Sequence, residues 1–277
     1  MANIEERYFY GKDGSKIFFR SSVPENPIAT VIILHGYAEH SGRYIHVMDY
    51  LTSRNFAVFA PDERGHGKTA RVMGDLEGFD RIIDDTDILV KQAAEKYPTR
   101  GVFMLGHSMG GMIALLYTEK YQEKLKGLIL SGPMLVLSEQ PSGFLRLLSK
   151  VMGKLLPRLP VKSFDSSYVS RDNEVVKRKD EDPLYYKGKV MARAGYWFLK
   201  GIDEAIADLG RIEIPVLVMH GGGDRIIDPE ASKIVYHNVS SEDKTLKIFD
   251  GLYHEIMNEP EKDEVLKMIG DWIEKRV

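Results

Sequence analysis

A serine between two glycines, in the stretch "FMLGHSMGGM", is the feature of this sequence that most directly suggests chemistry. Ser108 stands two residues after Gly106 and two residues before Gly110. A tight turn from a strand into a helix strains the backbone at its tip and brings neighbouring chain very close, so a glycine is needed on each side. Such a turn lifts a hydroxyl clear of the sheet and aims a helix N-terminus at it. G-x-S-x-G is typical of a nucleophile elbow in that setting.

The residues around this turn have the required character. Residues 101–105, "GVFML", are predicted to form a buried strand, and residues 109–124 have helical character. The alternative is a glycine-rich turn that holds an idle serine. The pattern therefore predicts Ser108 as a nucleophile, provided that an acid and a base are placed beside it.

An acid and a base follow the ends of two later strands. Asp224 comes just after the apolar run "IPVLVMHG", and His254 follows "KTLKIFDG". Active groups gather at the carboxyl ends of strands in such a sheet, and the order Ser, Asp, His is that of the α/β-hydrolases. His254 would take the serine proton and later protonate the leaving group, while Asp224 would fix its tautomer. Asp228 is the alternative acid, although its position before Pro229 is typical of a helix N-cap.

Seven further histidines could compete for the role of base: His35, His40, His46, His66, His107, His220 and His237. His107 adjoins the serine, and successive residues at such a turn point apart. His35 precedes a glycine and is predicted to brace the neighbouring loop. His220 also stands at a strand end. His40, His46, His66 and His237 fall in helices or loops with no acid partner placed by the fold, and His254 is favoured.

Attack on a carbonyl produces an oxyanion that needs two fixed donors. The backbone N–H of Met109, at the start of a helix, is the first predicted donor. The N–H of Tyr37, in the loop after "VIILHG", is the second. The piece "DERGHG" lacks the phosphate-loop pattern and is interpreted as a structural turn. No metal-binding motif is present, so we expect neither metal nor cofactor.

Composition limits the class of protein. The 277 residues include 38 Lys and Arg against 41 Asp and Glu, a net charge of −3, which argues against nucleic-acid binding. Cysteine is absent, so disulfides and thiolate chemistry are excluded. There is no signal-like N-terminus and no apolar run near the roughly 18 residues of a spanning helix. We expect a soluble cytoplasmic protein.

Continuous apolar runs alternate with helical segments along most of the chain. This pattern predicts an α/β fold with a mostly parallel, eight-stranded sheet that carries helices on both faces, preceded by a hairpin that turns at residues 12–14. A long interruption breaks the alternation. We therefore predict a core of residues 1–132 and 210–277, with an insertion at 133–209.

The insertion opens with a basic, apolar stretch that contains no acidic residue. Arg146, Lys150 and Lys154 recur every four residues and so share one helix face, and Pro157 should end the helix. Much of the remaining surface is apolar: Phe144, Leu145, Leu147, Leu148, Val151, Met152, Leu155 and Leu156. One interpretation is a helix that packs on the core with a solvated basic face. A basic amphipathic helix is also typical of a membrane surface, and we favour transient, peripheral contact of this kind.

Several motifs together resemble the monoacylglycerol lipases, in the lysophospholipase-like branch of the serine α/β-hydrolases. They are "LHGYAEHSGRY", "FAPDERGHGKT", "LGHSMGG", "FDSSYVSRD" with "DPLYY", and "KTLKIFDGLYHEI" with "NEP". The resemblance covers nearly the whole chain. It implies a helical cap over an acyl-chain tunnel, with the apolar rim of the cap resting on membrane. It also assigns the nucleophile, acid, base and oxyanion donors to the residues already chosen.

The resemblance bears on substrate as well. Glu39 and Arg43 match the polar end of the family's site, near the alcohol group, and a direct substrate contact and a loop-bracing ion pair remain equal alternatives. Tyr37 departs from the family pattern, which often has a small residue there. The implied activity is hydrolysis of single-chain glycerides. The alternatives are a lysophospholipase, a thioesterase or carboxylesterase for medium or long chains, and a silent member of the fold used as a binding module.

Overall fold

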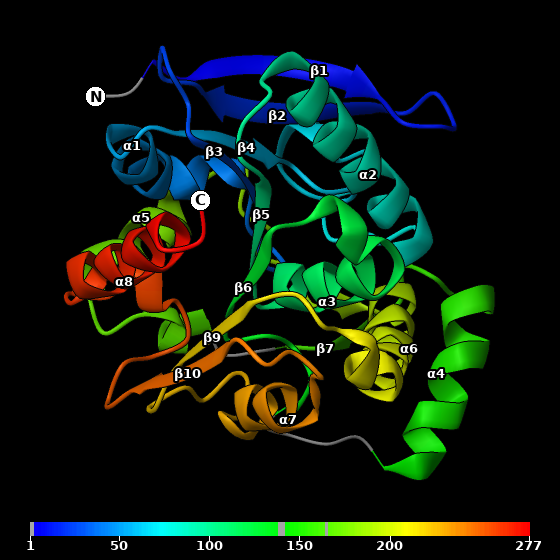
Figure 1. Cartoon of the computed structure of the whole chain (residues 1–277). Coiled ribbons are helices and arrows are strands. Elements are labelled where there is room, and N and C mark those ends of the chain that lie inside the picture. The colour runs from blue at the N-terminus through cyan, green and yellow to red at the C-terminus, as the bar shows by residue number, and fades with distance from the viewer. Residues whose placement is uncertain (1–2, 138–141, 164–165) are drawn as a thin grey trace.

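The fold centres on one eight-stranded sheet, seen in the computed structural model of the chain, which describes residues 3–137, 142–163 and 166–277 (Figure 1). The strand order is β1-β2-β4-β3-β5-β6-β9-β10. The strands are β1 Glu5–Tyr10, β2 Lys16–Ser22, β3 Ala29–Leu34, β4 Phe56–Pro61, β5 Val102–His107, β6 Gly127–Ser131, β9 Val216–Gly221 and β10 Lys244–Phe249. From β4 to β10 all pairs are parallel, whereas β1 and β2 form the predicted antiparallel hairpin.

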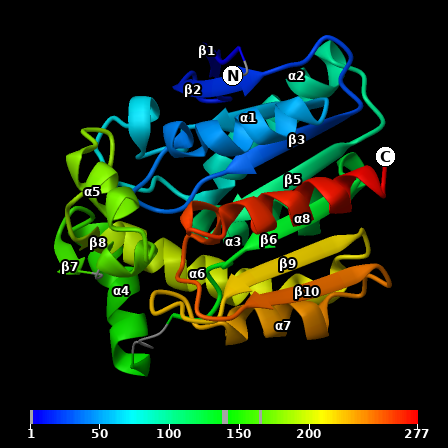
Figure 2. The same cartoon turned by 90° about the vertical axis from the view of Figure 1, so that its left-hand side faces the viewer.

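Helices cover both faces of the sheet because its central strands are apolar on both sides. Successive residues of β3 alternate: Ile32 packs in one core cluster and Ile33 in the other. Helices α1 (Ile45–Ser53) and α8 (Lys262–Glu274) cover one face, and α2 (Phe79–Lys96), α3 (Met109–Tyr121) and α7 (Glu230–Asn238) cover the other (Figure 2). The mostly parallel sheet with helices on both faces is as predicted from the sequence.

The interruption predicted between two strands is present between β6 and β9. It contains α4 (Gly143–Leu155), α5 (Asn173–Glu181) and α6 (Ala192–Asp208), with a small antiparallel pair of β7 (Pro160–Lys162) and β8 (Val190–Met191) that the sequence did not predict. Helix α6 packs on α3, and α4 packs on α6 at the outside of the molecule in both views (Figures 1 and 2). Helix α4 ends before Pro157, as predicted.

The carboxyl edge of the sheet lies beneath this insertion. The Tyr186 N–H donates to the carbonyl of Ala38, 2.7 Å away, just after β3. The Glu255 N–H donates to the carbonyl of Val169 at 2.8 Å, just after β10. Backbone hydrogen bonds therefore join the insertion to the loops at which the sequence places the site.

Candidate active site

Ser108 occupies a strained turn between β5 and α3. Its φ of 53° and ψ of −116° lie in a region that side chains other than glycine rarely adopt. A Cβ on Gly106 would lie 2.4 Å from the carbonyl oxygen of Gly110, and one on Gly110 would lie 2.2 Å from that of Leu34. Both contacts are impossible for a larger residue. The predicted need for glycine on each side of Ser108 is confirmed.

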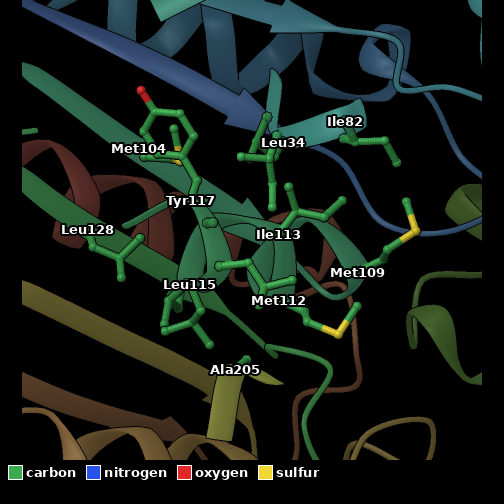
Figure 3. Packing of buried hydrophobic residues seen from close by; sticks show 14 of the residues in the cluster. Leu34, Ile82, Met104, Met109, Met112, Ile113, Leu115, Tyr117, Leu128 and Ala205 are labelled. Atoms are coloured by element: carbon green, nitrogen blue, oxygen red, sulfur yellow. The ribbon is translucent and has the colours of Figure 1, made fainter. Parts of the chain in front are cut away.

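Helix α3 gives this turn a rigid base. Its residues from Met109 to Thr118 are all buried, and their side chains pack against Leu34, Ile82 and Ala205 from three other elements (Figure 3). A helix buried on all sides cannot shift without disturbing the core. The strain at Ser108 is therefore held by the packing of the helix that follows it.

The candidate acid and base are hydrogen-bonded to each other. His254 Nδ1 lies 2.6 Å from Asp224 Oδ2, and the Asp224 Oδ1 accepts the N–H groups of Ile226 at 2.8 Å and Ile227 at 3.0 Å. Burial opposes the ionisation of Asp224. The nearby His254 charge and the hydrogen bonds outweigh it, so the pKa of Asp224 lies well below its usual value. Asp224 is thus an anion that fixes the proton of His254 on Nδ1.

His254 is in turn set beside the serine turn. The Ser108 N–H donates to the Ser131 carbonyl at 3.0 Å, and a Cβ on the next residue, Gly132, would lie 3.4 Å from His254 Nδ1. The rings of His107 and His254 lie with their centroids 4.7 Å apart and their planes inclined at 48°. Within the described residues Ser108 Oγ has no hydrogen bond to His254, and such bonds often tighten only when substrate binds.

The two neighbouring histidines differ in the direction in which their pKa values are shifted. Burial alone would lower the pKa of His254, but the Asp224 carboxylate raises it above 6.5. Burial and the neighbouring His254 lower the pKa of His107 to about 4, so His107 is neutral near pH 7. Its Nδ1 lies 3.0 Å from the Ser131 carbonyl. The Asp224 carboxylate thus favours the protonated form of His254, whereas burial favours the neutral form of His107.

Two backbone N–H groups near Ser108 are unpartnered. Neither Tyr37 nor Met109 uses its N–H in a hydrogen bond among the described residues. The peptide that carries the Tyr37 N–H has its carbonyl, that of Gly36, 2.7 Å from His35 Nδ1. His35 Nε2 accepts the Glu63 N–H at 2.9 Å, so Nδ1 carries the proton and donates it. Since the peptide is planar, His35 fixes the direction of the Tyr37 N–H. This is the bracing role predicted for His35.

The side chain of Tyr37 extends away from the sheet into the insertion. Its hydroxyl donates to the Gly74 carbonyl at 2.9 Å, and its ring makes edge contacts with Phe198, Tyr186 and His66. A small residue could not make these contacts. The bulk of Tyr37 therefore joins the loop after β3 to α6.

Glu39 is buried, Arg43 is half-buried with a side chain only 9% exposed, and the two are paired. Arg43 Nη1 donates to Glu39 Oε2 at 3.1 Å and to Glu255 Oε1 at 2.6 Å, and Arg43 Nη2 donates to Glu255 Oε2 at 2.7 Å. These are the contacts of an ion pair that braces a loop. Sequence reasoning missed Glu255, although its position directly after His254 was a usable signal.

His220 is the second residue that sequence reasoning did not place. Its Nε2 lies 3.0 Å from Asp224 Oδ2, the oxygen that also contacts His254, and its Nδ1 lies 2.7 Å from Ser232 Oγ. His220 lies on β9 four residues before Asp224. A histidine at that spacing, at a strand end, was the available signal.

The remaining residues weighed in the sequence have structural contacts. Asp228 Oδ1 accepts the Glu230 N–H at 2.9 Å, which is a capping bond at the start of α7. In the turn "DERGHG", Asp62 accepts the Ser41 and Lys68 N–H groups, both at 2.8 Å, so this turn ties the end of β4 to the segment that follows β3. Within the described part of the chain, no group of three or more histidine, cysteine or acidic side chains could hold a metal ion.

Comparison with known proteins shows the family of this chain. A family profile described as serine aminopeptidase, S33, matches residues 25–261. The chain belongs to this family. A monoacylglycerol lipase of Mycolicibacterium smegmatis is 38% identical to this S33-family chain, with 97% of this chain and 96% of the relative covered. A human monoglyceride lipase is 32% identical over 95% of this chain and 88% of the relative.

A solved S33-like structure has the same architecture. The crystal structure of Paleococcus ferrophilus monoacylglycerol lipase superposes with a TM-score of 0.84 at 28% identity, covering 99% of this chain and all of that one. The α/β-hydrolase fold and the resemblance to monoacylglycerol lipases, both predicted from the sequence, are confirmed.

Proposed function

We propose that this chain is an ester hydrolase that cleaves monoacylglycerols to fatty acid and glycerol through an acyl-enzyme on Ser108. The observation that carries the proposal is the buried Asp224–His254 pair beside a strained serine. Near that serine lie two backbone N–H groups that have no hydrogen bond among the described residues. Full-length relatives named as monoacylglycerol lipases support this substrate class.

The residues would work in the following order. His254 Nε2 takes the proton of Ser108 Oγ as that oxygen attacks the acyl carbonyl. The Tyr37 and Met109 N–H groups bind the resulting oxyanion, and α3 adds the positive end of its dipole. His254 then protonates the departing glycerol oxygen. A water molecule, activated by the same histidine, releases the fatty acid.

The insertion, residues 133–209, serves in this proposal as a cap over the acyl chain. Support comes from its backbone bonds to the loops after β3 and β10 and from the contacts of Tyr37 with Phe198 and Tyr186. A cap in this place shields the acyl-enzyme from bulk water.

We further assign membrane contact to the outer end of the cap. Five large apolar side chains are exposed at the end of α4 and just after it, namely Val151, Leu155, Leu156, Leu159 and Val161. Exposed cations alternate with them at Lys150, Lys154 and Arg158. An apolar patch with interspersed cations suits an anionic lipid surface. No helix among the described residues is long and apolar enough to span a bilayer.

A substrate panel tests the proposed activity. Wild type should hydrolyse monoacylglycerol faster than diacylglycerol, triacylglycerol or lysophospholipid of the same acyl chain. Ser108→Ala should lose several powers of ten in kcat while remaining folded, and a serine-directed phosphonate should label wild type only. Labelling of the variant at a comparable rate would exclude Ser108 as the nucleophile.

Phospholipid hydrolysis is the second candidate. A Bacillus subtilis protein named phospholipase YtpA is 34% identical over 88% of this chain. The same panel separates the two, because faster hydrolysis of lysophospholipid than of monoacylglycerol would replace the proposed substrate and leave the ester chemistry unchanged.

A further inference from the structure

Arg43 joins the loop after β3 to the loop after β10, and both loops carry residues of the proposed active site. Its guanidinium donates two hydrogen bonds to Glu255, which follows His254, and one to Glu39, which follows the oxyanion loop. The side chains of all three are less than one-tenth exposed. The ring of Tyr185, from the insertion, lies over the guanidinium with its centroid 5.5 Å away. Substrate has little access to Arg43 in this arrangement.

Glu39, at one end of the network that it forms with Arg43 and Glu255, is hydrogen-bonded to the backbone of the oxyanion loop. Glu39 Oε1 accepts the Gly36 N–H at 2.6 Å and the Tyr44 hydroxyl at 2.7 Å. A Cβ on Gly36 would lie 3.2 Å from the Cβ of Ser108, so this backbone passes very close to the nucleophile. Glu39 thus binds the N–H of Gly36, whereas His35 binds the carbonyl of the same residue. Together they fix the backbone directly before the Tyr37 N–H.

The Glu255 end controls the loop of the base. Glu255 also makes two hydrogen bonds with Asn258. Its Oε2 accepts an N–H of the Asn258 side chain at 3.0 Å, and its backbone carbonyl accepts the Asn258 backbone N–H at 2.7 Å. Burial alone would raise the pKa of Glu255, but the charge and hydrogen bonds of Arg43 outweigh it and hold that pKa below its usual value. Without Arg43, two buried carboxylates would face each other with no cation between them, and both loops would have to move.

We propose that Arg43 is a positioning residue that fixes the oxyanion loop relative to His254, and that it does so without binding the alcohol part of the substrate. The inference rests on the proposed function and adds to it. A displacement of about 1 Å between reacting groups can cost on the order of 100-fold in rate. Loss of Arg43 should therefore lower kcat for every ester, whatever its alcohol.

The experiment compares two substrates with one acyl chain, a monoacylglycerol and a soluble aryl ester that lacks glycerol. Arg43→Gln and Glu255→Gln should each lower kcat by about 100-fold on both substrates, with KM changed little. The double variant should lose about as much as either single variant, because both remove the same link. Arg43→Lys, which keeps the charge but not the bidentate geometry, should recover part of the rate.

Arg54→Gln is the matched control. Arg54 also bridges two carboxylates, those of Asp271 at 2.7 Å and Glu274 at 2.8 Å, but it joins the end of α1 to α8, away from the site. It should change stability without changing kcat. Thermal unfolding of each variant shows whether a lower rate reflects loss of folded protein. If Arg43→Gln does not fold, Glu255→Gln and Arg43→Lys still test the positioning role of Arg43.

The outcomes are distinct. A loss confined to the monoacylglycerol, with the aryl ester unaffected, would overturn the proposal and make Arg43 a glycerol-binding residue. Less than threefold loss on both substrates would also overturn it. If wild type cleaves the aryl ester but no monoacylglycerol, the proposed substrate is wrong. Rates on the aryl ester and rates of phosphonate labelling then still test the role of Arg43. If wild type neither cleaves nor labels, the proposed function is refuted and this inference with it.

Discussion

His254 Nδ1 and Asp224 Oδ2 lie 2.6 Å apart, although 30 residues separate them in sequence and each is carried by its own loop. Strands β9 and β10 are parallel neighbours with Val216 opposite Lys244, so their carboxyl ends finish side by side and bring these two loops together. The short contact between an ionised carboxylate and the imidazole has consequences that can be measured.

The acid should be Asp224 and not Asp228. Asp224→Asn should lower kcat by about 10⁴, because asparagine no longer holds the proton on Nδ1 of His254. Asp228→Asn is the matched control and should keep most of the activity, since asparagine caps a helix nearly as well as aspartate. Steady-state kinetics on a soluble ester measures both. The reverse ranking would exchange the two roles.

The pH profile should report the His254 pKa. His254 accepts a proton only while it is neutral, so kcat/KM should fall as the pH drops through its pKa. Because Asp224 raises that pKa, the midpoint of the acid limb should lie above 6.5. His107 cannot produce this limb, since its pKa is about 4. In Glu255→Gln the limb should move to lower pH, because the Glu255 charge also raises the His254 pKa. A limb below 6 in wild type would contradict this reading.

The sheet and the positions of the candidate site residues were predictable because each leaves a local pattern. Apolar runs marked the strands, and the glycines around Ser108 marked the turn. The pairing of Arg43 with Glu255 left no such pattern, because 212 residues separate the two and only folding brings them together. Strand β8 has only two residues, too few for an alternation to show.

The insertion was harder to predict in detail for the same reason. Arg146 was interpreted as one of three cations on an open helix face, but it pairs with Asp203 of α6. Lys150 and Lys154 are exposed as expected, as are Val151 and Leu155. The predicted apolar positions Phe144, Leu145 and Leu147 have side chains outside the described residues, and Phe164 of the motif "FDSSYVSRD" also lies outside them.

Strain at the serine turn should be measurable as stability. Ser108→Gly should raise the free energy of unfolding by about 1–3 kcal/mol, because glycine adopts a φ of 53° without steric cost. Ser108→Ala is the control, since it removes the hydroxyl but keeps the Cβ and therefore the strain. The melting temperature of the glycine variant should be a few degrees above those of the alanine variant and of wild type. Equal melting temperatures for the two variants would mean that the turn stores no strain.

The last prediction concerns the outer end of the cap, where Lys150 and Lys154 stand among exposed apolar side chains. Each cation near an anionic lipid surface contributes about 1 kcal/mol, so removing both should weaken vesicle binding by about thirtyfold. Adding Arg146→Gln to this double variant should weaken binding by less than the removal of a third unpaired cation would, because Asp203 already neutralises Arg146. Cosedimentation with vesicles rich in anionic lipid, at low and high salt, measures this.

The apolar side chains of this surface supply the second part of the same test. Leu155 is 74% exposed, so Leu155→Gln removes lipid-facing area at little cost to the fold and should weaken binding at high salt as well as at low salt. Lys96→Gln with Lys126→Gln removes the same charge at the opposite, amino-terminal edge of the sheet and should leave binding unchanged. Hydrolysis of a short soluble ester should stay at the wild-type rate in all of these variants. If wild type does not bind vesicles, the cap does not contact membrane. The same conclusion follows if the control pair reduces binding as much as the cap variants do.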